Sequence, residues 1–64
     1  MFKPGFILMT TAQFEAAIFN KTPVCVWQHG NIIEYGGPIE VATENAVSIN
    51  GEKYLRAVCE FRIR

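Results

Sequence analysis

The sequence predicts a small α+β domain in which one short N-terminal helix packs on a strongly curved antiparallel sheet of four or five strands. Three observations predict this fold. Residues 10–21 have a helical spacing of apolar residues, and the chain after them has alternating or β-branched runs. Asn50-Gly51 is the preferred sequence for a tight hairpin turn. Gly36-Gly37-Pro38 indicates a sharp bend within the strand region.

The helix is predicted to begin at Thr10 or Thr11. Thr10 and Gln13 have the capping-box spacing, in which each side chain accepts a hydrogen bond from the other residue's backbone N–H. One helix face is apolar and carries Phe14, Ala17 and Ile18. Pro23 prevents the helix from continuing. Ahead of the helix, residues 6–8 form either a short edge strand or a hydrophobic strap across the helix.

The rest of the chain is predicted to be extended. His29-Gly30-Asn31 is a turn between two apolar runs, so the first two strands form a hairpin. Beyond the glycine bend, residues 39–43 alternate in polarity and place Ile39 and Val41 on one face. The predicted strands cover residues 24–28, 32–35, 39–43, 46–49 and a closing strand of about 12 residues that ends the chain.

The register of the last hairpin depends on the length of its loop. A two-residue loop pairs Val47 with Tyr54, whereas a three-residue loop, Asn50-Gly51-Glu52, pairs Val47 with Leu55. One face of the closing strand is apolar, with Leu55, Ala57, Cys59, Phe61 and Ile63. We favour the three-residue loop because it turns that face toward the core.

Composition indicates a single domain, residues 1–64, that associates with other chains. Half of the residues are hydrophobic and only 19% are charged, which is a low charged fraction for a domain whose surface is large relative to its volume. We therefore expect some apolar side chains to be covered in a homo-oligomer or by a protein partner. Six basic and six acidic residues balance, which argues against non-specific nucleic-acid binding without excluding a local basic edge.

The expected location is the cytoplasm. The chain has no apolar stretch near the roughly 20 residues of a membrane span, so no membrane association is predicted. Cys25 and Cys59 both lie in apolar strand-like runs, as buried free thiols in a reducing compartment do.

No constellation of catalytic residues is evident, so we predict that the protein is not an enzyme and has no cofactor. His29 lies in a turn and lacks a nucleophile in an activating environment. One histidine and two cysteines are too few for a structural zinc site. Glu34 and Glu40 flank the glycine bend, but a solvated strand face is the usual place for such carboxylates.

Six residues are candidates for an interaction surface. Trp27 and Tyr35 are aromatic residues on strands; Trp27 is either an interface anchor or a core residue beneath the helix. The closing strand has a second face with a stripe of arginines, which binds either an acidic partner or cross-strand glutamates. This face carries Tyr54, Arg56, Arg62 and Arg64.

The order of elements in residues 10–64, a short helix and then strands with a glycine bend at Gly36-Gly37-Pro38, resembles that of Sm-like and SH3-like small barrels. The resemblance implies a curved sheet. It implies no RNA-binding residues, because those of Sm-like proteins have no assigned counterpart here. We expect a non-enzymatic interaction or regulatory protein that self-associates or inhibits a larger partner, as small proteins encoded by mobile elements do. The alternatives are a barrel that binds RNA or single-stranded nucleic acid, and a small-ligand binder with a pocket between protomers.

Overall fold

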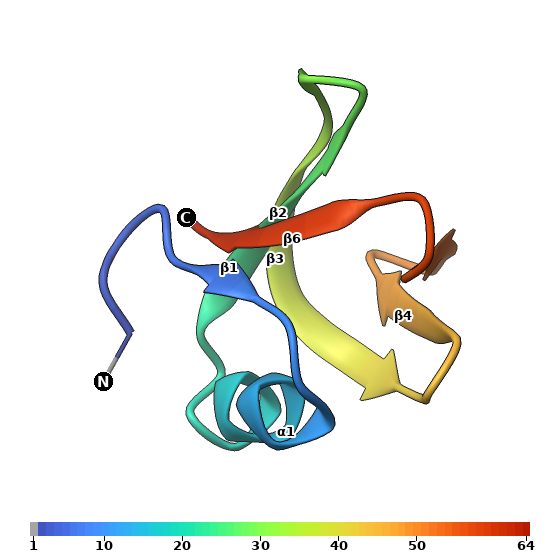
Figure 1. Ribbon diagram of the computed structural model, residues 1–64. Coiled ribbons are helices and arrows are strands. Elements are labelled where there is room, and N and C mark those ends of the chain that lie inside the picture. The colour runs from blue at the N-terminus through green and yellow to red at the C-terminus, as the bar shows by residue number, and fades with distance from the viewer. Residues whose placement is uncertain (1) are drawn as a thin grey trace.

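A computed structural model describes residues 2–64 as one short helix and a six-stranded antiparallel sheet. The sheet order is β1-β6-β2-β3-β4-β5, and β1 and β5 are its unjoined edges (Figure 1). The α+β class is confirmed, with six strands in place of the expected four or five. Residues 7–8 form a strand and the closing strand divides in two, while the strands expected at residues 32–35 and 39–43 are one strand. The elements are β1 (Ile7–Leu8), α1 (Thr11–Phe19), β2 (Pro23–Gln28), β3 (Asn31–Ala42), β4 (Ala46–Ile49), β5 (Glu52–Leu55) and β6 (Glu60–Ile63).

The capping box predicted for the helix is confirmed. Thr10 Oγ1 accepts from the Gln13 backbone N–H at 3.1 Å, and Gln13 Oε1 accepts from the Thr10 N–H at 3.0 Å. The helix ends at Phe19, and the backbone N–H of its C-cap residue Asn20 donates to the Ala16 carbonyl at 3.0 Å. Phe14 and Ala17 are buried, and α1 packs on β3. In the described part of the chain, no helix has the length and apolar character needed to cross a membrane.

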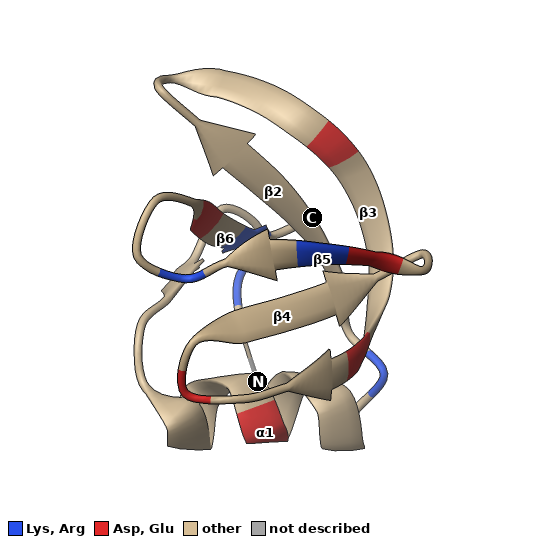
Figure 2. Cartoon of the chain, turned by 90° about the vertical axis from the view of Figure 1, so that its right-hand side faces the viewer, with Lys and Arg blue, Asp and Glu red and all other residues tan. Residues whose placement is uncertain are grey.

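β3 is one long, curved strand that runs through the glycine bend (Figure 2). The sharp bend expected at Gly36-Gly37-Pro38 is present and coincides with a bulge, but the strands expected on either side of it, residues 32–35 and 39–43, form one strand. The bend arises because β3 has one residue more than its partner strand in each of three intervals, and each surplus residue forms a bulge that increases twist. These intervals lie between Ile32 and Glu34, between Glu34 and Gly37, and between Ile39 and Val41.

The third bulge overturns the expected alternation of residues 39–43. Ile39 is buried, but Val41, predicted on the same face, is 55% exposed. The backbone pairs Ile39 with Ile49 and Val41 with Ser48, so two steps along β3 match one step along β4. A bulge of this kind rotates the side chains that follow it.

The last hairpin has the two-residue loop, and our preference for three residues is wrong. Val47 pairs with Tyr54, and both loop residues have positive φ, 53° at Asn50 and 79° at Gly51. This conformation matches the twist of the flanking strands. The expected closing strand is also interrupted by a turn at residues 56–58. Leu55, expected on the core face, is therefore 55% exposed.

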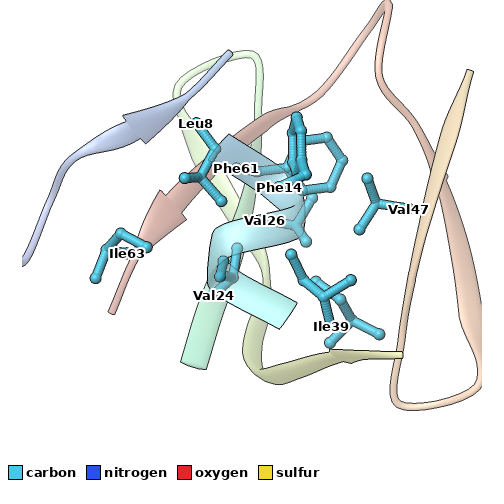
Figure 3. Close-up of a cluster of buried hydrophobic side chains, with 10 residues drawn as sticks. Leu8, Phe14, Val24, Val26, Ile39, Val47, Phe61 and Ile63 are labelled. Atoms are coloured by element: carbon cyan, nitrogen blue, oxygen red, sulfur yellow. The ribbon is translucent and has the colours of Figure 1, made fainter. Parts of the chain in front are cut away.

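A single apolar core joins the helix to the sheet (Figure 3). Phe14 of α1 meets Phe61 of β6 edge to face, with ring centroids 5.4 Å apart. The half-buried Tyr54 of β5 packs against the same cluster. The buried members are Leu8, Phe14, Ala17, Val24, Val26, Ile39, Val47, Ile49, Phe61 and Ile63.

Candidate interaction surface

The side of β6, β2 and β3 that faces away from the core holds several of the candidate residues. Val26 and Phe61 pair across β2 and β6 and are both buried in the core. The next pair along, Trp27 and Glu60, therefore lies on the opposite side, since successive strand residues alternate between faces. We call this side the outer face and define it by Trp27, Glu60 and Arg62.

Trp27 lies on the outer face beneath an arginine. The Arg62 guanidinium sits over the indole ring, 4.2 Å from the ring centre, in a cation–π contact. Glu60 Oε1 accepts from both Arg62 Nε at 3.1 Å and Arg62 Nη2 at 2.6 Å, which fixes the guanidinium in place. Trp27 is half-buried as a result. It is thus neither a plug beneath the helix nor a freely exposed aromatic.

Ile33 and Tyr35 project from β3 and are 46% and 70% exposed. They flank Glu34, whose carboxylate binds the Tyr54 hydroxyl of β5. The backbone edge beside them is open. β2 pairs with one side of β3 from residue 31 to 38, whereas β4 pairs on the other side only at Ile39, Val41 and Ala42. Within residues 2–64, the second edge of residues 31–37 therefore has no strand partner.

Tyr54 belongs to a separate cluster around Glu34. The Tyr54 hydroxyl donates to Glu34 Oε1 at 3.1 Å, while the Gly36 N–H and Asn50 Nδ2 donate to Oε2 at 3.0 and 3.2 Å. These hydrogen bonds, the one from Gly36 foremost, hold the pKa of Glu34 below its ordinary value. Burial, and then the neighbouring Glu34, raises the pKa of Tyr54. The cluster fastens the β4–β5 hairpin to β3.

Glu40 serves the same hairpin, and the two carboxylates considered as a pair have separate partners. Glu40 Oε1 accepts from the Gly51 N–H at 3.0 Å, next to the residue that Glu34 holds. Each carboxylate thus binds backbone or side-chain donors of the Asn50-Gly51 turn. This arrangement explains why a hairpin at the edge of the sheet is held against the bent middle of β3.

The expected arginine face is not formed as one surface, because the turn at residues 56–58 separates Arg56 from Arg62. The Arg56 guanidinium lies 4.5 Å from the centre of the Phe14 ring. It donates to the Thr43 carbonyl at 2.7 Å and to the Met9 carbonyl at 3.3 Å, so it spans the opening between the ends of β5 and β1. Arg64 is exposed just after β6, and its backbone N–H donates to the Pro23 carbonyl at 3.1 Å.

A pocket of about 310 Å³ lies at one end of the outer face, between the tip of the β2–β3 hairpin and the turn before β6. Trp27, His29, Val58, Cys59 and Glu60 contribute to its wall. Burial raises the pKa of the Cys59 thiol, which disfavours the nucleophilic thiolate. Sequence reasoning missed this pocket, because nothing in the sequence indicates that residues 57–60 turn toward residues 27–30.

In the part of the chain that the structure describes, no three His, Cys, Asp or Glu side chains gather closely enough to hold a metal ion. Comparisons with protein families, curated proteins and solved structures found no match for this chain. The candidate interaction features of this chain are therefore the outer face, the free edge of β3 and the pocket.

Proposed function

We propose that this protein is a non-enzymatic interaction protein that binds other protein chains, including a second copy of itself, through the free edge of β3. The supporting observation is that Tyr35, 70% exposed, lies on a strand whose second backbone edge is unpaired over residues 31–37 of the described chain. Apart from the Gly36 N–H, which already donates to Glu34, such an edge offers N–H and C=O groups to an added strand. Ile33 and Tyr35 then supply apolar contact to the side chains of that strand.

For the finer architecture, we propose a partly open small barrel of the SH3-like or Sm-like kind. β3 supports this interpretation because it pairs with β2 along its first part and with β4 along its last part, and so serves both halves of the sheet. Arg56 supports it as well, because its side chain links the turn after β5 to Met9, directly after β1. The likeness concerns shape and carries no RNA-binding activity.

Nucleic-acid binding has less support than protein binding. Two of the three arginines on the expected basic stripe already bind groups of the same chain, Arg62 through Glu60 and Arg56 through two backbone carbonyls. The face shown in Figure 2 has acidic and basic residues interspersed along its strands and turns. A protein that binds a phosphate backbone generally presents free cationic groups on one side.

The free cysteines support a reducing compartment such as the cytoplasm as the place of action. Cys25 is buried, and its Sγ donates to the Arg62 carbonyl at 3.4 Å. Cys59 lies at the turn before β6, three residues from the Arg62 that pairs with Cys25. The two thiols are therefore held in separate environments, as structural cysteines of reduced proteins are.

Light scattering coupled to size-exclusion chromatography, at micromolar protein concentration, tests self-association. We expect at least twice the chain mass of 7.2 kDa. The double variant Ile33→Thr/Tyr35→Thr keeps β-forming side chains but removes the apolar contact, and it should elute as a monomer. Val41→Thr is the matched control, since Val41 is 55% exposed on the same strand but pairs with β4.

Two outcomes contradict the proposal. A wild-type chain that is monomeric throughout this concentration range refutes self-association. A double variant that keeps the wild-type mass shows that the association uses another surface. Salt dependence addresses the nucleic-acid alternative, because binding of single-stranded RNA that weakens steeply with added salt would favour it over the protein-binding proposal.

A further inference from the structure

A groove lies between α1 and the chain ahead of β1, residues 2–6, which we call the N-terminal arm. Its volume is about 480 Å³, and its wall is formed by Phe2, Lys3, Phe6, Ala16 and Asn20. Backbone hydrogen bonds hold the arm on the sheet, since the Gly5 N–H donates to the Ile63 carbonyl at 2.7 Å and the Ile63 N–H donates to the Phe6 carbonyl at 2.9 Å. Both walls of the groove therefore belong to hydrogen-bonded parts of the fold.

Three phenylalanines make this part of the surface apolar. The ring centroids of Phe2 and Phe6 are 5.1 Å apart, and Phe6 is 39% exposed. Phe19 extends the apolar surface along the helix, because residues three apart are neighbours on a helix and Phe19 follows Ala16 by three. Its side chain is 86% exposed. Exposed aromatic residues gathered around a groove are typical of a contact surface.

The charges around the groove are positive. Lys3 is part of the wall, and Lys21 directly follows Asn20. Arg64 follows the residue that binds the arm, and the arm, the end of α1 and the C-terminus lie on one side of the molecule (Figure 1). All three cations are exposed, and within residues 2–64 their side chains make no ion pair. Half of the six basic residues thus gather here, although the net charge of the chain is zero.

Negative charge is kept away from the groove. Among the described residues, no acidic side chain contributes to its wall. Glu15 is the acidic residue of α1, but successive helical residues are about 100° apart around the axis, so it is rotated by about 100° from Ala16 and by about 140° from Asn20. An apolar groove with unpaired cations around it complements a partner that carries negative charge.

We propose that this groove binds an acidic segment of a partner protein, with one bulky apolar side chain in the groove and carboxylates on either side of it paired with Lys3, Lys21 and Arg64. A hollow lined by aromatic residues receives a projecting anchor side chain. Carboxylates beside that anchor form charge-assisted hydrogen bonds with the cations. The inference goes beyond the edge pairing of β3 and does not depend on it, because the residues of the wall belong to the N-terminal arm and α1.

Other negatively charged partners fit the groove less well. A membrane surface is entered by projecting side chains, and the hollow of about 480 Å³ would remain unfilled beneath it. Single-stranded nucleic acid stacks its bases on open aromatic faces. Phe2, however, is half-buried, packs against the core and has its ring against that of Phe6.

Titration of the 15N-labelled protein with the peptide acetyl-Glu-Asp-Phe-Asp-Glu-amide tests the proposal. The backbone peaks of Phe6, Ala16 and Asn20 should shift together and saturate, with a Kd of about 1 mM. The uncharged peptide acetyl-Gln-Asn-Phe-Asn-Gln-amide should bind about fivefold more weakly. Acetyl-Glu-Asp-Gly-Asp-Glu-amide, which lacks the anchor, should bind at least about tenfold more weakly. Peaks that stay fixed at about 5 mM of the first peptide, or equal binding of either control peptide, overturn the proposal.

Variants assign the contacts. Ala16→Leu fills the groove and should weaken binding of the first peptide about tenfold. Lys3→Gln, at an exposed position, should weaken it about twofold to fivefold, which keeps the test decisive if Ala16→Leu disturbs the helix. Lys53→Gln removes the same charge from β5, outside the groove, and should bind as the wild type does. Unchanged affinity in Lys3→Gln, or in a folded Ala16→Leu, refutes the assigned contacts.

Two further probes separate this partner from the other polyanions, and a mass measurement separates it from the edge pairing. Vesicles of phosphatidylserine and phosphatidylcholine, or oligothymidylate, should not bind in competition with the first peptide. Binding of either one to a protein that ignores the peptide overturns the proposal. Lys3→Gln should keep the wild-type mass in light scattering, because the groove is separate from β3.

Discussion

Replacement of Gly36 by alanine tests whether close packing of β3 against β2 determines the fold. Gly36 has a φ of +88°, where residues with a side chain are strained. An added Cβ would lie 1.7 Å from the Val24 carbonyl oxygen and 2.5 Å from its carbonyl carbon. Both atoms belong to the backbone of a central strand, so no side-chain rotation relieves the contact. β2 and β3 would have to separate at the bulge.

The expected loss is large for a domain of this size. An L side chain in the left-handed region costs about 1–2 kcal/mol, and overpacking of a tight interior costs a further 1–3 kcal/mol, roughly. The sum, about 2–5 kcal/mol, compares with the ~3–5 kcal/mol that a core of this size supplies. At about 4–8 °C per kcal/mol, Gly36→Ala should lower the Tm by at least about 8 °C.

Gly30→Ala is the matched control for this prediction. Gly30 also has a positive φ, +76°, but nothing lies within 4 Å of its added Cβ. Thermal unfolding of both variants, followed by circular dichroism, separates the backbone cost that they share from the steric cost of Gly36→Ala alone. Gly36→Ala should be less stable than Gly30→Ala by about 1–3 kcal/mol. Equal Tm values would refute the steric argument.

Two further predictions concern the contacts that hold the open side of the sheet. The pKa of Glu34 is lowered in the folded state, so its contribution to stability is present above its ordinary pKa and is lost as pH falls toward the lowered value. In urea unfolding, the free energy of unfolding of Glu34→Gln should therefore fall less than that of the wild type between about pH 6 and 3. An equal fall of the unfolding free energy with pH in both proteins would contradict the hydrogen-bonded cluster. Arg56→Lys loses the planar guanidinium over Phe14 and should lower the free energy of unfolding by about 1–2 kcal/mol. The control Arg64→Lys, at an exposed position, should change the Tm little. Equal Tm values for the two variants would contradict the bridging role of Arg56.

Local chemistry made the helix and the hairpins predictable. The Thr10 hydroxyl and the Gln13 amide act within one turn of helix, so a pattern of four residues contains the whole interaction. Asn50-Gly51 likewise forms its turn from its own backbone preferences. Our error at this hairpin came from giving the long apolar alternation that follows more weight than the turn itself.

Features that depend on distant contacts were not predictable. The turn at residues 56–58 contains Arg56, Ala57 and Val58, none of which favours turns. The bonds of Arg56 to residues far away in sequence accompany this turn. The same turn divides the expected arginine stripe and forms part of the pocket beside Trp27, so neither feature was predictable. Of the candidate residues, the sequence placed Trp27, Tyr35, Tyr54 and Arg62 on strands correctly, but it gave no indication of the Arg62 contact with Trp27.

The place of β6 between β1 and β2 determines the order in which the chain can assemble. β6 is the last strand in sequence, yet β1, one of the first elements, has no other strand to pair with. The β2–β3 and β4–β5 hairpins need only neighbouring residues, so they can form early. β1 can join only after some fifty residues have been brought into a closed loop, which makes this docking the slow, entropically costly step. Until then, the strand edge of β2 and the apolar side chains of β6 remain open to other chains, and folding competes with aggregation.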